Sequence, residues 1–240
     1  MAQEVETIMR IVLLTGAGIS AESGLGTFRD EGGLWAQHDL ADVATPEAFM
    51  RDPNLVHRFY NARRQNAAEA QPNAAHRALT KLQTEHSDSV IIVTQNVDDL
   101  HERAGSEGVI HMHGELTGAL CAACGERWSA PAQMNPDDPC PSCNKPTTRP
   151  DIVWFGEMPL QMDEIHDLAE QSALFVSIGT SGEVYPAAGF VTMFKDMRKP
   201  TVELNLEPSR NQDQFNFSIH KPATVAVEEF KNLLIKNLCF

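Results

Sequence analysis

Four short apolar runs recur along the chain, and polar or glycine-containing residues follow each of them. They cover residues 11–14, 89–94, 174–179 and 201–206. Continuous apolar runs of this length are typical of strands buried on both faces of a parallel sheet. Helical stretches lie between the runs. This alternation predicts an α/β fold with a doubly wound, Rossmann-like parallel sheet, whose ligands bind beyond the carboxyl ends of the strands.

Three segments carry the clearest helical patterns. Asn73 is expected to cap a helix that runs through Leu79 and Leu82. Residues 163–172 form a second predicted helix. A third is predicted at the C-terminal end, where the following apolar residues have helical spacing: Val227, Phe230, Leu233, Leu234 and Leu238.

Two regions interrupt the alternation of strand and helix. Residues 34–71 are predicted to be mostly helical, whereas residues 116–150 contain cysteines and several prolines without a helical period. We interpret both as insertions that form a smaller second domain at the edge of the sheet. The predicted Rossmann-like domain comprises residues 1–33, 73–114 and 155–240, and the predicted small domain comprises residues 34–72 and 115–154.

Four cysteines occur as two Cys-x-x-Cys pairs separated by about fifteen residues, a spacing typical of zinc sites. Four thiolates complete a tetrahedral coordination sphere and leave no open position for a catalytic water, so we expect one structural Zn²⁺ per chain. The alternatives are two disulfides, or cysteines buried as small apolar residues. The predicted ligands are Cys121, Cys124, Cys140 and Cys143.

The formal net charge of −14 argues against non-specific binding to nucleic acids and against docking on anionic membranes. No apolar run is long enough to span a membrane, and the run at residues 11–14 is too short for the core of a signal peptide. Paired thiols without an export signal are typical of the reducing cytoplasm. Cys239 is expected to be a bystander, and a monomer is the default expectation.

The sequence after the first apolar run matches the Gly-x-Gly-x-x-Gly/Ala pattern of dinucleotide-binding turns, with Gly16, Gly18 and Ala21 at the small positions. Small residues there allow backbone N–H groups to approach a pyrophosphate. The alternative is a simple strand-to-helix turn. Residues 22–33 are too rich in glycine for the long helix that usually follows, and they predict a loop that closes over a cofactor.

Polar residues follow the second predicted strand. Gln95, Asn96 and Asp98 are well placed to bind ribose hydroxyls or a carboxamide, although a polar helix cap would have the same composition. His111 and His113 come next, and histidine is the usual general base near neutral pH. Either histidine could instead form structural hydrogen bonds, and their spacing does not decide between the two.

Taken together, these motifs resemble the sirtuins, a family of NAD-dependent protein lysine deacylases. The resemblance covers nearly the whole chain, and the motifs occur in the order found in the family. It is strongest to short bacterial members of the class that also contains the desuccinylases. The motifs are Gly16-Ala17-Gly18-Ile19-Ser20, Thr27-Phe28-Arg29, Thr94-Gln95-Asn96-x-Asp98, His113-Gly114, the four cysteines, Gly179-Thr180-Ser181 and Asn205-x-Glu207.

The resemblance implies a role for each matching residue. His113 is implied as the catalytic base, with Asn96 and Asp98 in the catalytic group, while His111 has a supporting or structural role. Val153, Trp154, Phe155 and Gly156 resemble the segment that pairs with the substrate peptide as an added strand. The implied NAD-binding residues are Gly16, Ala17, Gly18, Ser20, Ala21, Thr27, Phe28, Arg29, Trp35, Gln95, Asn96, Asp98, Gly179, Thr180, Ser181, Asn205, Leu206, Glu207 and Ala223.

The resemblance also implies a mechanism. The acyl-lysine carbonyl oxygen attacks the ribose carbon that bears nicotinamide, and His113 accepts a proton relayed from the ribose hydroxyls. The products are free lysine, nicotinamide and O-acyl-ADP-ribose. The alternatives are a mono-ADP-ribosyltransferase that uses the same NAD site, or a module that binds NAD or peptide without catalysis.

Tyr60 and Arg63 share one face of a predicted helix. An arginine can pair with a carboxylate through two hydrogen bonds, and a tyrosine hydroxyl can add a third. Without the family context, an exposed arginine beside a packed tyrosine is the simpler reading. Within the family, the Tyr-x-x-Arg pair resembles the element that recognises succinyl and malonyl groups. We therefore expect activity on acetyl-lysine and succinyl-lysine in proteins.

Overall fold

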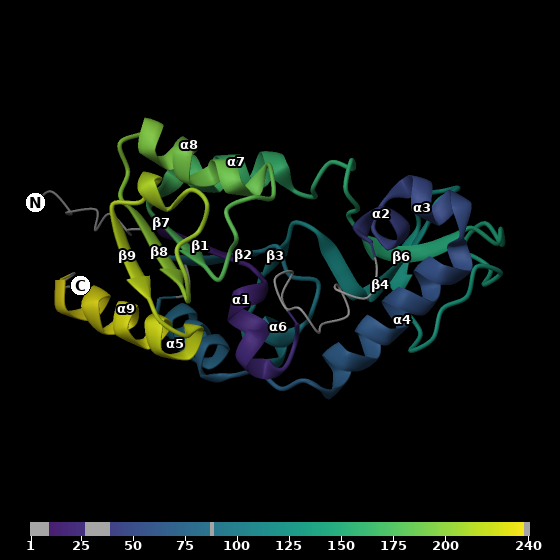
Figure 1. Cartoon of the computed structure of the whole chain (residues 1–240), viewed down its shortest axis with the longest axis horizontal. Helices are drawn as coiled ribbons and strands as arrows, with labels where there is room; N and C mark the ends of the chain where they lie inside the picture. The colour runs from purple at the N-terminus through teal and green to yellow at the C-terminus, as the bar shows by residue number, and fades with distance from the viewer. Residues whose placement is uncertain (1–9, 27–38, 87–88, 238–240) are drawn as a thin grey trace, which may run out of the picture.

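A six-stranded parallel sheet forms the larger part of the molecule (Figure 1). The structure is a computed structural model, and it describes residues 10–26, 39–86 and 89–237. Leu13 at the centre of the sheet lies beside Ile92 on one side and Val176 on the other. In spatial order the strands are β3 (Ile110–His111), β2 (Val90–Thr94), β1 (Arg10–Thr15), β7 (Ser172–Ile178), β8 (Thr201–Asn205) and β9 (Phe217–His220).

The four strands predicted from apolar runs are confirmed as β1, β2, β7 and β8, which fill the centre of the sheet. The sequence analysis did not predict β3 and β9. Both lie at an edge; β3 has only two residues, and only Ile219 of β9 is buried. A strand of two residues is too short to form an apolar run, and a strand exposed on one face leaves no continuous run in the sequence.

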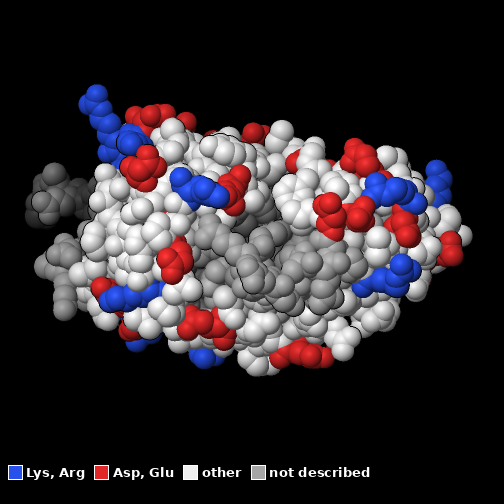
Figure 2. Space-filling view, in the orientation of Figure 1, with Lys and Arg blue, Asp and Glu red and all other residues white. Residues whose placement is uncertain are grey.

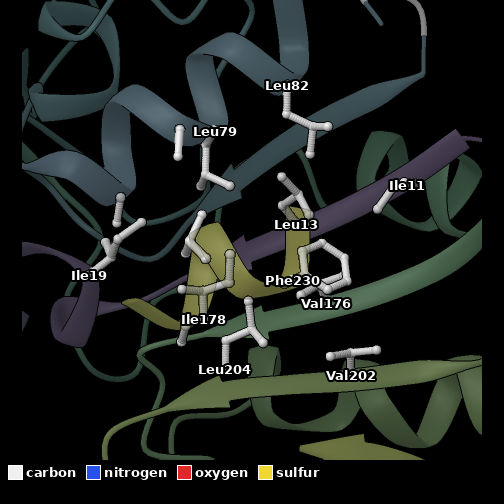
Figure 3. Close-up of a cluster of buried hydrophobic side chains, with 14 of the residues drawn as sticks. Ile11, Leu13, Ile19, Leu79, Leu82, Val176, Ile178, Val202, Leu204 and Phe230 are labelled. Atoms are coloured by element: carbon white, nitrogen blue, oxygen red, sulfur yellow. The ribbon is translucent and has the colours of Figure 1, made fainter. Parts of the chain in front are cut away.

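Helices cover both faces of this sheet, as a doubly wound fold requires. The helices α5 (Ala74–Glu85) and α9 (Ala223–Asn237) pack on one face, where Leu79 and Phe230 belong to one buried cluster with Val176 and Leu204 (Figure 3). The helices α7 (Met162–Gln171) and α8 (Phe190–Asp196) cover the other face. All three predicted helices are confirmed, although Leu238 lies outside the described residues.

The helix α5 begins where the sequence indicates. The Asn73 side chain accepts hydrogen bonds from the backbone N–H groups of Ala75 and His76, at 2.9 and 3.4 Å. In return, Nδ1 of His76 accepts from the backbone N–H of Asn73 at 3.3 Å. This reciprocal capping satisfies N–H groups that have no partner within the helix.

A second unit carries its own hydrophobic core, which includes Phe59, Tyr60, Leu116, Ile152 and Trp154. Its helical part confirms the prediction for residues 34–71 as far as they are described. The cysteine-containing part, for which no secondary structure was predicted, forms a three-stranded antiparallel sheet. The exact division into two domains stays a prediction. The elements of this unit are α2 (Leu40–Val43), α3 (Pro46–Arg51), α4 (Pro53–Glu69), β4 (Gly114–Cys121), β5 (Arg127–Ser129) and β6 (Thr148–Ile152).

Short helical turns occupy the connections after several strands. Within the described ranges, no helix is both long and apolar enough to cross a lipid bilayer. The turns are α1 (Ala17–Ser20), α6 (Leu100–Arg103) and the 3₁₀ turns η1 (Ala21–Ser23), η3 (Ala187–Gly189) and η4 (Gln212–Gln214).

The four predicted zinc ligands form one cluster, with their Sγ atoms within 4.8 Å of one another. The sulfurs of Cys121 and Cys143 are 3.7 Å apart, as are those of Cys124 and Cys140. A disulfide requires about 2.0 Å, so these four cysteines are free thiols in the structure. Zn–S bonds of about 2.3 Å in a tetrahedron place neighbouring sulfurs about 3.8 Å apart, so the cluster fits Zn²⁺.

The two Cys-x-x-Cys turns have the same local structure. Gly125 and Asn144 follow them with φ of 78° and 58°, and their N–H groups donate to the carbonyls of Cys121 and Cys140 at 2.9 Å. In each turn a backbone N–H also points at the first sulfur, at 3.4 Å. These N–H groups stabilise thiolates, which are the form that binds metal.

We predict that Cys124→Ser removes the bound zinc and lowers the free energy of unfolding by about 3 kcal/mol or more, because metal binding and folding of the cysteine-containing sheet are coupled. Zinc content and urea unfolding measure the two effects. Ser142→Ala is the control, because it changes an exposed side chain in the other turn and leaves all four sulfurs in place. A Cys124→Ser protein that keeps its zinc, or that loses zinc but unfolds at the same urea concentration as the wild type, would refute the prediction.

Candidate functional site

The carboxyl ends of β1 and β7 meet at the point where the strand order reverses, which is where doubly wound sheets bind ligands. The backbone N–H of Gly18 donates to the carbonyl of Gly179 at 2.9 Å. A Cβ on Gly18 would lie 2.6 Å from the Gly179 Cα. Gly179 has a φ of 65°, and its own Cβ would lie 2.5 Å from the backbone nitrogen of Ile19. The glycine turn is therefore pressed directly against the loop after β7.

The turn after β1 is short, as the sequence analysis expected. The helix α1 has four residues, and a 3₁₀ turn continues it as far as Gly24, whose φ is 85°. Gly16 precedes α1 without a side-chain cap. The N–H groups of Gly18 and Ile19 in the first turn donate to the carbonyls of Gly179 and Gly16, at 2.9 and 3.1 Å. The predicted cofactor-binding residues Thr27, Phe28, Arg29 and Trp35 lie outside the described residues.

Ser20 connects α1 to the polar segment that follows β2. Its hydroxyl donates to Oδ2 of Asp98 at 3.2 Å and accepts from Nδ2 of Asn96 at 3.1 Å. Burial raises the pKa of Asp98, while hydrogen bonds from the Leu100 N–H and the Ser20 hydroxyl lower it. The structure thus brings together three residues predicted for the cofactor site, each of them buried.

Two buried histidines behind this group were missed by the sequence analysis. Nε2 of His76 lies 3.5 Å from the Ser20 hydroxyl, and Nε2 of His101 lies 3.0 Å from Oγ1 of Thr15. Burial lowers the pKa of His76 to about 4 and that of His101 well below its usual value, so both rings are neutral. No local pattern marks them, because they meet only through the packing of α5 and α6 behind the strand ends.

His113 and His111 differ in their surroundings. Nδ1 of His113 lies 3.1 Å from the backbone carbonyl of Gln95. A carbonyl can only accept, so Nδ1 carries the proton and Nε2 is the basic nitrogen. Burial lowers the pKa of His113, and the hydrogen bond to Gln95 opposes this effect.

His111 is fixed at both of its ring nitrogens. Its Nε2 lies 2.9 Å from a carboxylate oxygen of Glu102, and its Nδ1 lies 3.2 Å from the carbonyl of Asn96. Burial opposes the charged ring, but the Glu102 and Glu115 carboxylates raise the pKa of His111 overall. The ring ties β3 to the segment after β2, which is a structural arrangement.

The ends of β7 and β8 form the other half of the predicted cofactor site. Nδ2 of Asn205 donates to the carbonyl of Thr180 at 2.7 Å, and the Thr180 hydroxyl lies 2.8 Å from that of Ser177. Gln95 and Thr180 line one small cavity, which joins this half to the segment after β2. Ser181 and Glu207 lie in the adjoining loops, Leu206 is exposed, and Ala223 is the buried first residue of α9.

The 3₁₀ turn η1, which follows the glycine turn, is bonded to α9. The carboxylate of Glu22 accepts from the backbone N–H and the hydroxyl of Thr224, both at 2.9 Å. An acidic side chain from a distant part of the chain thereby caps this helix. The contact holds the first turn of α9, where Ala223 lies, beside η1.

Tyr60 and Arg63 lie on α4 beside the segment of residues 153–156. Tyr60 is only 1% exposed, and Nε1 of Trp154 donates to its hydroxyl at 3.0 Å. Burial lowers the pKa of Arg63, while Tyr60 and the Asp98 carboxylate raise it. Arg63 therefore lies within electrostatic reach of the predicted cofactor site.

The predicted peptide-binding segment is partly engaged within the protein. The N–H of Val153 donates to the carbonyl of His113 at 2.9 Å, and that of Phe155 donates to the carbonyl of Ala44 at 3.0 Å. The Trp154 ring is buried, whereas Phe155 is 44% exposed and Gly156 has open space around it. A peptide strand here would have to pair with backbone groups other than these two N–H groups.

Comparisons with known proteins agree with this geometry. The profile of the Sir2 family matches residues 16–186. An NAD-dependent protein deacylase of Caulobacter vibrioides is 51% identical over 235 residues, with 96% of this chain and 99% of that protein covered. A mutant Sir2 homologue in complex with ADP-ribose has a TM-score of 0.87 at 34% identity, covering 99% of this chain and 98% of that one. A Sir2 homologue in complex with NAD has a TM-score of 0.86 at 36% identity, covering 95% and 90%. The chain therefore belongs to the Sir2 family, the sirtuins.

Proposed function

We propose that this chain is an NAD-dependent protein lysine deacylase that removes acetyl, succinyl and malonyl groups. The acyl group passes to ADP-ribose and nicotinamide is released. Family membership and a relative named NAD-dependent protein deacylase at 51% identity support the reaction class. The observation that carries the proposal is the hydrogen bond of His113 to the carbonyl of Gln95, which joins the ring to the segment whose Asn96 and Asp98 bond to Ser20.

The described residues fit NAD. The glycine turn at the switch point of the sheet is where a pyrophosphate would lie, and the Ser20 group offers buried hydroxyl, amide and carboxylate atoms for the nicotinamide ribose. Gly179, Thr180, Asn205 and the start of α9 would surround the adenosine half. When bound, NAD would supply the ribose carbon that receives the acyl oxygen.

His113 acts as the general base. Its Nδ1 proton is held by the Gln95 carbonyl, which fixes the tautomer and leaves Nε2 to accept a proton. Burial keeps the ring neutral at pH 7. The backbone carbonyl of His113 also accepts from Val153, so the base and the start of the peptide-binding segment hold a fixed relation to each other.

The acyl-lysine peptide would lie along residues 153–156. The N–H groups of Val153 and Phe155 and the carbonyl of Trp154 are already engaged, so other carbonyls of this segment would receive the N–H groups of the peptide. The exposed Phe155 ring offers an apolar contact for the lysine stem. The zinc cluster holds the sheet that ends in this segment and takes no part in the chemistry.

We infer that the protein acts as a cytoplasmic monomer without nucleic-acid or membrane contacts. The four free thiols support a reducing compartment. The net charge of −14 disfavours polyanions. On the face shown in Figure 2, the basic side chains of the described residues are interspersed with acidic ones.

Replacing His113 tests the general base. We predict that His113→Gln lowers the rate of acyl transfer about a hundredfold or more, because the proton acceptor is lost. Binding of NAD should persist, and calorimetry measures it. His166→Gln on the exposed side of α7 is the matched control and should keep the wild-type rate. A His113→Gln enzyme with undiminished acyl transfer would exclude this role.

The pH dependence of kcat/KM follows from the same pKa. The neutral ring is the active form, so activity falls as the pH drops through the pKa of His113 in the free enzyme. Burial lowers this pKa, which places the acid limb below pH 6.5. Deacetylation of one peptide between pH 4.5 and 8.5 measures the limb. A midpoint above 6.5 would contradict the assignment.

The substrate preference of the enzyme tests the proposed role of Tyr60 and Arg63. We predict that Arg63→Met lowers the ratio of desuccinylation to deacetylation about tenfold, because the guanidinium partner of the acyl carboxylate is lost. The ratio is measured on one peptide with either acyl group. Arg58→Met, on the same helix but exposed, should keep the ratio of the wild type. If Arg63→Met hydrolyses succinyl-lysine at the wild-type rate, another group recognises the carboxylate.

A further inference from the structure

The hydroxyl of Tyr60 is held by a neighbour that can only donate. Nε1 of Trp154 is a donor without acceptor capacity, and it points at the Tyr60 oxygen at 3.0 Å. A tyrosine hydroxyl that accepts this bond keeps its own proton free to donate. Arg63, also a donor only, raises the local positive potential beside the same hydroxyl and lies with its Cζ 5.6 Å from the centre of the Tyr60 ring.

This hydroxyl is deeply buried, so its proton needs a partner. Tyr60 is 1% exposed, and the hydrogen bonds between described residues provide no acceptor for its proton. A buried donor without an acceptor is destabilising. An acyl group that ends in a carboxylate can supply the acceptor, whereas an acetyl group ends in a methyl group, which cannot.

The Trp154 ring is held in place, and this fixes the direction in which its N–H points toward the Tyr60 hydroxyl. The Cζ atom of Arg149 lies 3.5 Å from the centre of the Trp154 ring. Arg149 also donates to both carboxylate oxygens of Glu157, at 2.7 and 2.9 Å. The same carboxylate accepts from the backbone N–H of Trp154 at 2.8 Å. The indole is therefore fixed through both its face and its backbone.

We propose that Trp154 is a positioning residue for acidic acyl groups, because its indole N–H orients the Tyr60 hydroxyl as a donor toward the acyl carboxylate. This inference rests on the proposed role of Tyr60 and Arg63 in acyl recognition. It assigns Trp154 to acyl selectivity instead of direct contact with the peptide. A site built to hydrogen-bond a substrate group discriminates against analogues that lack that group.

The test compares succinyl and acetyl forms of one peptide, with kcat and KM measured for each. Trp154→Phe keeps an aromatic ring and removes the N–H. We expect the succinyl-to-acetyl ratio of kcat/KM to fall about tenfold, mainly through the KM for the succinyl peptide. Trp128→Phe makes the same change on β5, and it should leave the ratio within about twofold of the wild type.

A double-mutant cycle separates positioning from general damage. If Trp154 acts through the Tyr60 hydroxyl, adding Trp154→Phe to Tyr60→Phe causes no further fall in the ratio. If the two losses multiply, the proposal is overturned. Replacing Trp154 by 3-benzothienylalanine, which has sulfur in place of the N–H, repeats the comparison without a cavity and covers the case in which Trp154→Phe does not fold.

The outcomes distinguish this inference from the function on which it rests. A wild-type enzyme that deacetylates but does not desuccinylate would refute the acyl assignment of Tyr60 and Arg63, and this inference with it. A wild-type enzyme with both activities, whose ratio is kept in Trp154→Phe or in the benzothienyl variant, would refute the inference alone. A selective fall in the ratio that depends on Tyr60 supports both.

Discussion

The rest of the site depends on the close contact between the glycine turn after β1 and Gly179 after β7. No side chain fits between these two backbones. Because the contact fixes the path of α1, it also fixes Ser20, which holds Asn96 and Asp98 by hydrogen bonds. One steric constraint at the switch point of the sheet thereby brings together groups from two strands.

A second constraint joins the two units of the molecule. His113 bonds through its ring to the carbonyl of Gln95, and through its backbone carbonyl to the N–H of Val153. The proposed base is thus held between the end of β2 and the segment that leaves β6. The zinc cluster supports this arrangement from farther away. The strand β4 ends at Cys121 in the cluster, and β6 begins at Thr148, which pairs with Cys121. Loss of metal would loosen the side of the site that we propose binds the peptide.

Features that depend on a local pattern could be predicted from the sequence. The central strands, the Asn73 cap and the four cysteines each have a signal within a few residues, and the structure confirms them. Prediction failed for the edge strands, because β3 has only two residues and β9 is mostly exposed, and for the three strands of the cysteine-containing sheet. The roles of His113, Tyr60 and Arg63 came from family resemblance and stay predictions.

By itself, the sequence determined the doubly wound sheet, the metal cluster and the family, because hydrophobic periodicity and motif spacing act over short distances along the chain. Only the tertiary structure decided which polar groups meet. The Tyr60–Trp154 hydrogen bond joins residues 94 positions apart, and the Glu22 contact with Thr224 joins residues 202 positions apart. Such pairs form only when separate elements pack together, since a hydrogen bond requires its two atoms to be about 3 Å apart, whatever their separation along the chain.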